Sequence, residues 1–550
     1  MACASGGEEQ AACLNCKKGN GRAEVSCAFP LLHNRESHDS PRTMKIRSVS
    51  RIRLLLYICA VSYGLTFWSF APVDPDLGWH LLGGEWTASN KAVPTTDFIN
   101  LFGATWHDYH WLAQLFMWWI FSAWGFLGLI WAFGLVMAGL CFTVVFIADR
   151  VMRGKLLGVG ILVTLMCAVL AVEAVASHRP QMLALVGLGM AVGVLVRRRQ
   201  AGELSALFIG TVIISNIHVY WIFVPLLWFI YRVIPRHGEH QRRYGLVGLA
   251  LLSIAPLFSP YGLLGADLSL LGIFQNYIVL FDYVLTPQIL STTLQEFRSS
   301  LADSGSPRWL VLGSLLVVAR EWGRGPRLAR RGDLYLFLLG LVLAVSKVKF
   351  IALFGLFSMP LMLRLLPRVL RSFNQHLGVP PASATRVTLA AGTITALAFA
   401  YLNRPTQSYE PSNLEIMYPI NACAQIVHDD LLQTLSKPIR VLVSFDHGGW
   451  CRWSMNRAAP SLDARVMADG RTQGQGGEYY KQLFDLFALK GAWISTLSRW
   501  RPDFAVVSKD TALAQFMALA GNAWTLVYQD GNFALFRARH DEFRANEEGD

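Results

Sequence analysis

The chain has 550 residues, of which 53% are apolar and 16% are charged. Soluble domains average about 45–50% apolar and about 25% charged residues, so this composition disfavours a single soluble globule and excludes a disordered chain, a collagen and a coiled coil. The 49 basic residues exceed the 37 acidic ones by 12, but they lie in short clusters between apolar runs. That pattern is typical of cytoplasmic loops rather than of a nucleic-acid-binding surface, and no nucleic-acid partner is expected.

The N-terminal segment differs from the rest of the chain. Residues 1–43 are polar and lack hydrophobic periodicity, and Met44 precedes a basic cluster. We expect residues 1–43 to be a disordered extension or an over-extended start. Cys13 and Cys16 form a C-x-x-C pair that zinc could use, but the over-extended start is the simpler interpretation.

Apolar runs predict a polytopic α-helical membrane domain over residues 44–402. Residues 54–71 are long enough to cross the ~30 Å hydrocarbon core, and the later runs predict about ten to thirteen transmembrane helices. The run 111–148 is too long for one crossing and short for two. Six tryptophans between residues 106 and 131 favour a surface helix followed by one crossing, and two crossings are the alternative.

The predicted first extracytoplasmic loop, residues 72–110, contains five acids and one lysine. Asp74 and Asp76, with His80 nearby, could hold a divalent cation, Mg²⁺ or Mn²⁺, or supply a base for an acceptor hydroxyl. The alternative is a solvated turn with an Asx cap that opens a helix near Leu77.

Several polar residues interrupt or flank the apolar runs. Arg179, Lys347 and Lys349 lie outside the cytoplasmic clusters and are candidates for binding a lipid phosphate, with interfacial snorkelling as the alternative. Asn216 and His218 break an apolar stretch, which indicates a polar cavity or a helical-hairpin turn with a satisfied amide. Two neighbouring residues are further cavity candidates or only a local salt bridge, namely Glu296 and Arg298.

After residue 402 the apolar runs shorten to strand length. We expect an extracytoplasmic α/β domain over residues 403–540 and a flexible tail over 541–550. Cys423 and Cys451 could pair if this domain faces an oxidising compartment. The predicted strands are 440–445, 504–508, 525–528 and 533–536, and the predicted helices lie near 421–434, 477–489 and 511–520.

Two turns in this second domain contain candidate functional residues. Asp446 opens a turn with two glycines that leads into a short aromatic helix, whose N-terminus could meet an anion. Asp469 and Arg471 flank a glycine and could contact sugar hydroxyls. Ordinary turn chemistry is the alternative for both.

Short motifs follow one another along the chain: Asp76-Leu-Gly-Trp-His-Leu81, Pro94-Thr-Thr-Asp97-Phe98, Trp111-Leu-Ala-Gln114, His178-Arg-Pro-Gln181, Asn216-Ile-His218, Gln295-Glu-Phe297, His447-Gly-Gly-Trp450 and Asp469-Gly-Arg471. In this order, over about residues 50–540, the chain resembles bacterial GT-C type glycosyltransferases, a mannosyltransferase-like superfamily of integral membrane enzymes. Gly78 stands where a second aromatic is expected.

The resemblance implies a GT-C fold and an inverting transfer. A sugar would pass from a polyprenyl-phosphate donor to a lipid-linked glycan, lipid or protein acceptor at the inner (plasma) membrane, with the C-terminal domain extracytoplasmic. It also implies that Asp76, or else Asp74, is the base or metal ligand, that His80 and Asp97 orient it or the acceptor, and that cationic side chains hold the leaving phosphate. Two alternatives are a transporter or flippase for lipid-linked sugars and a non-catalytic subunit of an envelope assembly.

Overall fold

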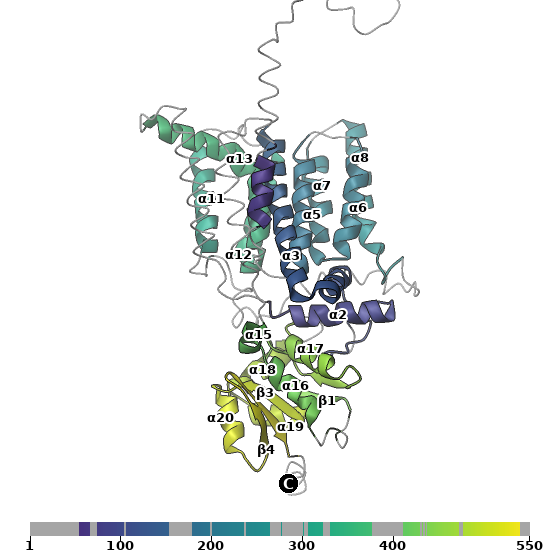
Figure 1. The fold of residues 1–550 in the computed structure, drawn as a ribbon. Coiled ribbons are helices and arrows are strands. Elements are labelled where there is room, and N and C mark those ends of the chain that lie inside the picture. Colours follow the sequence, from purple (N-terminus) through teal and green to yellow (C-terminus); the bar gives the residue numbers. More distant parts are fainter. Residues whose placement is uncertain are drawn as a thin grey trace, which may run out of the picture. The chain divides into compact units, whose positions relative to one another are not determined.

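The computed structural model (Figure 1) describes residues 54, 56–65, 74–103, 106–152, 179–197, 201–235, 238–263, 277, 301, 306–322, 331–376, 411–429, 432, 435, 437–471 and 477–539. The predicted extension 1–43, the predicted tail 541–550 and the pair Glu296 and Arg298 lie outside these residues.

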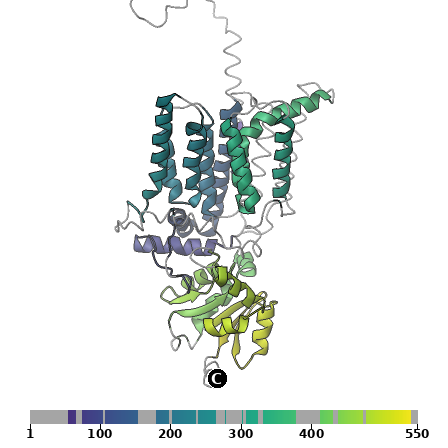
Figure 2. The ribbon, with the colours of Figure 1, turned by 180° about the vertical axis from the view of Figure 1, so that it is seen from behind.

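The first loop contributes one buried helix, α2 (Leu77–Asn90), which ends where Lys91 adopts a left-handed conformation with φ of 51°. Figures 1 and 2 show α2 lying crosswise to helices α5 to α8, between them and the C-terminal domain. Both faces of α2 therefore pack against protein. This position accounts for the burial of all its first eight residues, Leu77–Gly84.

Helix α3 (Trp111–Met152) is broken at Gly125, whose φ of 60° and ψ of −153° are non-helical. The break separates a first limb, residues 111–124, from a second limb, residues 126–152. At 1.5 Å per residue the second limb is about 40 Å long, which suffices for one crossing. The break agrees with the predicted surface helix followed by one crossing.

The other described helices of the apolar region run alongside one another, with α3 packed on α5 and α12 packed on α13 (Figures 1 and 2). In chain order they are α5 (Pro180–Leu195), α6 (Glu203–Ser215), η3 (Val219–Ile222), α7 (Phe223–Trp228), η4 (Phe229–Val233), α8 (Glu239–Ile254), η5 (Ala255–Leu257), α11 (Ser306–Trp322), α12 (Arg331–Ser346), η8 (Val348–Phe350) and α13 (Ile351–His376).

One end of these helices carries buried ion pairs. Glu203, at the start of α6, pairs with Arg232 of η4 at 2.8 Å, and Arg232 also donates to the carbonyl of Leu195, the last residue of α5, at 3.2 Å. Asp333, near the start of α12, pairs with Arg364 of α13 at 2.5 Å. We call this the basic end, because the predicted cytoplasmic clusters adjoin these helix termini.

The opposite end carries the first loop, and we call it the loop end. Trp111, at the start of α3, donates through Nε1 to Oδ1 of Asn216, which follows α6, at 2.9 Å. Asn216 in turn donates to the carbonyl of Phe258, which follows η5, at 2.9 Å. Arg179 precedes α5 at this same end.

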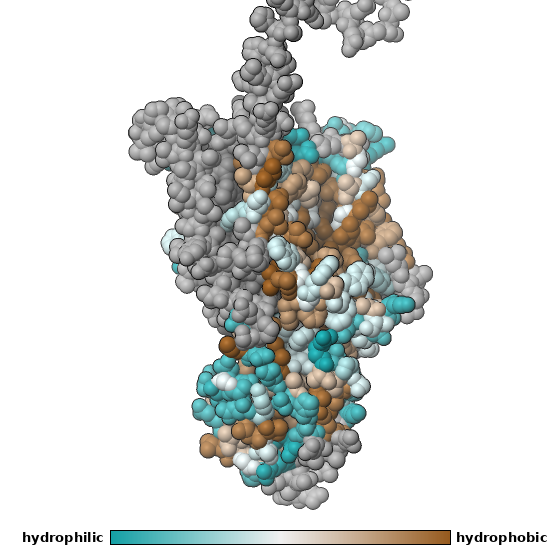
Figure 3. All heavy atoms as spheres, viewed as in Figure 1, coloured by the Kyte–Doolittle hydropathy of each residue, from teal (hydrophilic) through white to brown (hydrophobic). Residues whose placement is uncertain are grey.

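Two of the described helices are long and apolar enough to cross a membrane, Trp111–Met152 and Val348–Leu365, and four further apolar helices in the described residues are shorter. The surface of α3 is apolar, with Trp124 69%, Leu127 61% and Leu135 64% exposed. Figure 3 shows hydrophobic residues over much of the coloured part of the helical region, whereas hydrophilic residues are more frequent on the C-terminal domain. Apolar patches of this extent indicate contact with lipid or protein.

The C-terminal domain is a five-stranded sheet in the order β2-β1-β3-β5-β4. Strand β1 (Ile439–Val443) is parallel to β2 (Ala464–Val466) and β3 (Phe504–Ser508), and β5 (Phe533–Ala538) is antiparallel to β3 and β4 (Trp524–Gln529). The four predicted strands are confirmed to within two residues. The helices are α15 (Pro411–Met417), α16 (Ile420–Gln425), η9 (Ile426–His428), α17 (Gly448–Ala458), α18 (Gly477–Phe487), α19 (Trp493–Trp500) and α20 (Ala512–Leu519).

The first loop pairs with the outer edge of this sheet. Asn100 forms a parallel bridge with Val466 of β2. The amide of Val466 donates to the carbonyl of Ile99 at 3.0 Å, and the amide of Leu101 donates to the carbonyl of Val466 at 2.8 Å. The loop thus satisfies backbone groups that an edge strand would leave unpaired.

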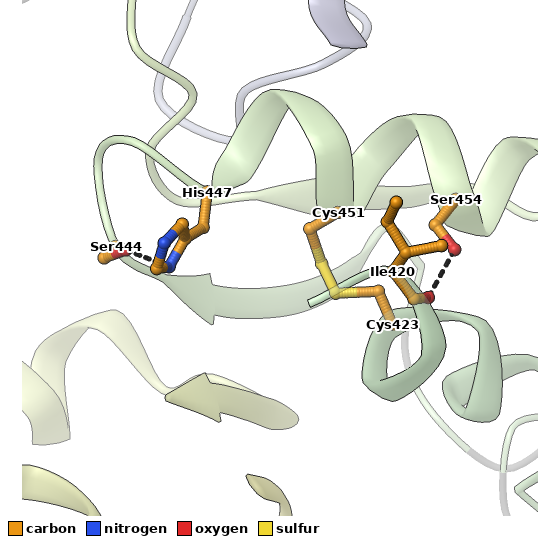
Figure 4. The surroundings of a disulfide bond; sticks show 6 residues. All are labelled: Ile420, Cys423, Ser444, His447, Cys451 and Ser454. Atoms are coloured by element: carbon orange, nitrogen blue, oxygen red, sulfur yellow. Dashed lines mark hydrogen bonds between the residues drawn. A yellow bond between two sulfur atoms is a disulfide. The ribbon is translucent and has the colours of Figure 1, made fainter. Parts of the chain in front are cut away.

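A disulfide joins Cys423 of α16 to Cys451 of α17 (Figure 4). Beside it, the hydroxyl of Ser454 donates to the carbonyl of Ile420 at 2.6 Å. The two cysteines that could pair from the sequence therefore do so, and they hold α17 against α16.

Candidate active site

The two aspartates that precede α2 have different environments. Asp74 is 1% exposed, and its Oδ1 accepts a hydrogen bond from the Asp76 amide at 2.7 Å. The Asx turn expected as the alternative is present, but it is buried instead of solvated. Asp76 occupies the N-cap position without making a capping hydrogen bond, and its side chain is 18% exposed. Of the two carboxylates, Asp76 is the one within reach of a substrate.

Arg179 contacts both aspartates from the N-terminus of α5. Its Nε lies 3.0 Å from Oδ2 of Asp74, and an NH2 group lies 3.3 Å from Oδ2 of Asp76. Pro180 begins α5 directly after it, in the first helical position where proline costs no hydrogen bond. The predicted phosphate ligand and the two predicted catalytic acids are therefore in one cluster.

The C-terminal domain approaches the same carboxylates. Trp450 donates through Nε1 to the carbonyl of Asp74 at 2.9 Å. Gly470 has φ of +82°, and a Cβ there would lie 2.7 Å from Oδ1 of Asp76. That oxygen also accepts from Nε1 of Trp79 at 3.2 Å. The site therefore has walls from both the first loop and the C-terminal domain.

Gly78 lies where α2 of the first loop meets α17 of the C-terminal domain. A Cβ on Gly78 of α2 would lie 2.6 Å from the carbonyl carbon of Gly449, at the start of α17. An aromatic side chain at this position would therefore push α17 away from α2. Gly78, which departs from the pattern of the resembled family, is explained by the close approach of these two helices.

Asp97, Asp469 and Arg471 form a buried ion-pair cluster. Arg471 donates to both oxygens of Asp97 at 2.9 Å, and it also donates to Asp469. Arg471 is 7% exposed, and its guanidinium stacks 4.4 Å from the ring centre of Trp106. Burial disfavours the charge, but Asp469 and Asp97 outweigh burial and raise the pKa of Arg471. In this arrangement the three side chains engage one another, and they link the first loop to the C-terminal domain.

His80 lies one helical turn after Asp76, and its amide donates to the carbonyl of Asp76 at 3.1 Å. It is 2% exposed, and its ring packs 3.7 Å from that of Trp79 and 5.4 Å from that of His110. Burial, followed by the charges of neighbouring groups including Arg179 and Arg471, holds the pKa of His80 well below its usual range. The imidazole is therefore neutral, which suits a positioning role better than the binding of an anion.

The predicted cavity residues divide into two groups. Asn216 uses its amide to join α3, α6 and the segment after η5, which matches the interpretation as a satisfied turn. His218 is 3% exposed, its ring lies 5.4 Å from that of His110, and Lys349 is within electrostatic reach of it. Lys347 directly precedes η8 at the same loop end.

Asp446 lies at the turn before α17 and is exposed. Burial raises the pKa of the Tyr418 hydroxyl, and the negative charges of Asp74, Asp76 and Asp446 raise it further. The Tyr418 ring stacks on Trp450, with ring centres 5.2 Å apart. Asp446 thus adjoins the catalytic cluster, and His447 beside it contacts Oγ of Ser444 at 2.8 Å (Figure 4).

The donor set at Asp74 and Asp76 does not fit a divalent cation in this arrangement. Arg179 occupies the position between the two carboxylates that a cation would take. Within the described residues, moreover, no group of three or more histidine, cysteine or acidic side chains could hold a metal ion. We therefore derive no chemical step through a metal.

An apolar groove between α3 and α5 reaches this cluster. It is partly open to solvent, and its walls include Phe116, Met117, Phe133 and Met182. Arg179 is the charged residue in its wall. A long hydrocarbon chain in this groove would bring a charged head group to Arg179.

Solved structures of one archaeal enzyme resemble this chain. The oligosaccharyltransferase of Archaeoglobus fulgidus in the apo form superposes with a TM-score of 0.57 and 11% sequence identity, over 85% of this chain and 71% of that chain. The same enzyme, AglB, with an inhibitory peptide and a dolichol-phosphate gives a TM-score of 0.55 and 10% identity over 89% and 74% of the two chains. With a tethered acceptor peptide containing the NVT sequon, it gives 0.51 and 12% over 89% and 74%.

The chain has the GT-C fold. This confirms the fold expected from the order of the short motifs. No protein-family model and no curated protein sequence matches the chain. At 10–12% identity the likeness shows the fold alone.

Four residues that shape the site were given no role of their own from the sequence, although Trp79, Trp450 and Gly470 stand in the short motifs. Trp79 follows Asp76 by three positions on a helix, a spacing that could have indicated contact. Tyr418, Trp450 and Gly470 lie more than 300 residues away in the chain, and no sequence signal placed them beside Asp76.

Proposed function

We propose that this chain is a membrane glycosyltransferase that transfers a sugar, with inversion, from a polyprenyl-phosphate-linked donor to an acceptor on the extracytoplasmic side. The position of Arg179 is the observation that carries the proposal. Arg179 contacts Asp76 through its guanidinium, and the same residue lines the apolar groove between α3 and α5. A prenyl chain in this groove would place its phosphate at Arg179 and its sugar next to Asp76.

In the proposed reaction Asp76 is the base. It takes the proton of an acceptor hydroxyl as the hydroxyl oxygen bonds to the anomeric carbon, and the bond from that carbon to the phosphate oxygen breaks. The prenyl phosphate leaves with the bonding electrons, and Arg179 stabilises its charge. Attack from the face opposite the leaving group inverts the anomeric configuration.

Arg179 is able to bind the phosphate without leaving the acids. A guanidinium has five N–H donors in a planar fork, and the contacts to Asp74 and Asp76 use Nε and an NH2 group. Asp74 is buried, so its charge holds Arg179 in place rather than reacting. Trp79 fixes the other oxygen of Asp76. Lys347 and Lys349 supply further positive charge at the loop end.

Two of the solved structures support the proposed donor and acceptor classes. The AglB structure with a dolichol-phosphate supports a lipid-phosphate donor, and the one with an acceptor peptide supports a protein as one acceptor class. A lipid-linked glycan and a lipid are the other two classes we propose. Asp446, which is exposed beside the cluster, is placed to contact the acceptor or the sugar.

We also propose that the chain is a multi-pass protein of the inner (plasma) membrane with about ten to thirteen crossings. The first loop and the C-terminal domain pair directly, so both lie on one side. The predicted cytoplasmic clusters adjoin the opposite helix ends. The disulfide between Cys423 and Cys451 supports an oxidising, extracytoplasmic location for the C-terminal domain.

Mass spectrometry of envelope glycolipids and glycoproteins tests this function. Membranes with and without the chain are compared, and the purified full-length chain is then given polyprenyl-phosphate sugars and the acceptor thus identified. We expect one glycan to lack a sugar without the chain and to regain it in the purified reaction. Identical glycans, or flipping of a lipid-linked sugar that survives loss of both Asp74 and Asp76, would contradict the proposal.

A further inference from the structure

Asp108, the acid that precedes α3, takes no part in the proposed reaction. It is 1% exposed, and its Oδ1 accepts hydrogen bonds from the His110 amide at 3.1 Å and from Nε2 of Gln114 at 2.9 Å. Its carbonyl accepts from the Trp111 amide at 3.3 Å. Asp108 thus holds the start of α3 and places His110.

Two atoms of this arrangement are buried without a hydrogen-bond partner. They are Oδ2 of Asp108 and Oε1 of Gln114, the remaining oxygens of the same carboxyl and the same amide. Both atoms are acceptors if Asp108 is ionised, and a buried acceptor without a donor destabilises the folded chain, more so if it is charged. A single proton would give both atoms a partner.

We propose that Asp108 is a neutral carboxylic acid in the folded chain, and that its Oδ2–H donates to Oε1 of Gln114. Together with the bond from Nε2 to Oδ1 this closes a cyclic acid–amide pair. The pair fixes the first turn of α3 and, through it, the ring of His110.

Arg471 and Tyr261, the groups around Asp108 that could donate, are engaged with other partners. The proposed proton is therefore what gives Oδ2 a hydrogen-bond partner. On the C-terminal domain the nearest charge is Arg471, which Asp97 and Asp469 already engage. After η5, the Tyr261 hydroxyl accepts from the Asp108 amide and donates to the carbonyl of Pro94, both at 2.9 Å, and so has no proton for Oδ2.

Two histidine rings are the remaining neighbours of Asp108. The ring of His107 lies on Tyr261, with centres 3.9 Å apart. Burial lowers the pKa of His110 to about 3, so that ring is neutral. From α2, Gly83 and Gly84 face Gln114, and a Cβ on Gly83 would collide with Oε1, which shows how closed this space is.

The pKa of Asp108 also favours the neutral acid. Burial raises the pKa of Asp108 to about 7, despite the bond from the His110 amide, the charge of Arg471 and the bond from Gln114. An unfolded aspartate releases its proton near pH 3.9. The folded chain therefore binds one more proton than the unfolded chain between about pH 4 and pH 7, and this group lowers stability progressively as pH rises across that range.

Asp108 is a positioning residue for the catalytic cluster. The ring of His110 lies 5.8 Å from Trp79 and 5.4 Å from His80, and Trp79 donates to Asp76. For any effect on transfer this inference rests on the proposed function. Its tests therefore read a spectrum and an unfolding midpoint, which do not depend on catalysis.

Asp108→Asn is the deciding variant, because an asparagine reproduces the neutral acid. Its Oδ1 accepts from Nε2 of Gln114, and its Nδ2 donates to Oε1, without a titrating group. Asp108→Ala removes both bonds and serves as the matched control. Full-length chains in detergent are compared by infrared difference spectroscopy and by unfolding midpoint from pH 4 to pH 9.

We expect the wild-type minus Asp108→Asn spectrum at pH 6 to show the carbonyl band of a protonated carboxylic acid, which loses intensity as pH rises through about 7. We also expect the unfolding midpoint of Asp108→Asn to equal that of the wild type at pH 4. As pH rises to about 7, the midpoint of Asp108→Asn should exceed that of the wild type by an increasing amount. The midpoint of Asp108→Ala should be lower than that of the wild type throughout. Absence of the band, or an Asn variant as unstable as the Ala variant, would overturn the proposal. Either result would leave the proposed transferase function untouched.

Discussion

The guanidinium of Arg471 donates to both carboxylate oxygens of Asp97 at 2.9 Å, and this contact joins residues 374 positions apart. It fastens the first loop to the C-terminal domain at the level of the candidate active site. Two further contacts also hold the first loop against the C-terminal domain, that of Gly78 with Gly449 and the pairing of Asn100 with Val466. Asp74 and Asp76, the proposed catalytic acids, therefore lie in a site that neither part of the chain forms alone.

Breaking this contact is expected to destabilise the chain. Asp97→Ala leaves the buried charge of Arg471 with Asp469 as its remaining acid, and loss of one partner of a buried pair costs about 3 kcal/mol. The unfolding midpoint measures the change. Arg243→Ala is the matched control, because its pair with Glu239 is exposed and is expected to contribute less than about 0.5 kcal/mol. Equal shifts in the two variants would contradict this.

Gly470→Ala is expected to impair transfer more than folding. Its φ of +82° costs alanine about 1–2 kcal/mol, and the new Cβ would displace the Asp76 carboxylate. A displacement of this kind lowers the transfer rate roughly 10- to 100-fold. Gly202→Ala is the control, because its φ is +74° with nothing within 4 Å. Similar losses of transfer in the two variants would exclude the contact with Asp76.

Reduction of the Cys423–Cys451 disulfide is expected to lower the free energy of unfolding by about 2–4 kcal/mol. The measurement is the unfolding midpoint with and without reductant. The Cys423→Ala/Cys451→Ala double variant provides the control and should not respond to reductant. If the wild-type chain also fails to respond, or alkylation finds both thiols free, the disulfide is absent from the folded protein.

Removal of divalent metal is expected to leave sugar transfer intact. Arg179 already contacts both the Asp74 and Asp76 carboxylates, and it supplies the positive charge for a leaving phosphate. The measurement is the transfer rate after treatment with a chelator. Loss of transfer that added Mg²⁺ or Mn²⁺ restores would show that the aspartates bind a cation and that Arg179 moves away from them.

Local patterns predicted the local structure of this chain. The four predicted strands form at their positions, because short β-branched and aromatic runs between turn residues are sufficient to indicate them. The three residues of β2 were too few to show periodicity. The break at Gly125 was not predicted as such, although the tryptophans around it indicated a change of environment.

Contacts distant in sequence could not be predicted in the same way. Arg179 was expected to bind a phosphate or to snorkel, but its contact with Asp74 spans 105 positions and no local pattern reports it. Asp97 and Arg471 were both singled out, each for a separate role. Their pairing depends on how the first loop and the sheet pack, which one sequence does not show.

The transfer rate of the Asp76→Asn variant tests the central claim most directly. Asparagine keeps the size of the side chain and an oxygen for Trp79, but it cannot take a proton from the acceptor hydroxyl. We expect the rate to fall at least about 100-fold, with an unfolding midpoint close to that of the wild type and with full activity in the Glu239→Gln control at the basic end. Transfer at the wild-type rate by Asp76→Asn would contradict the assignment of Asp76 as the base.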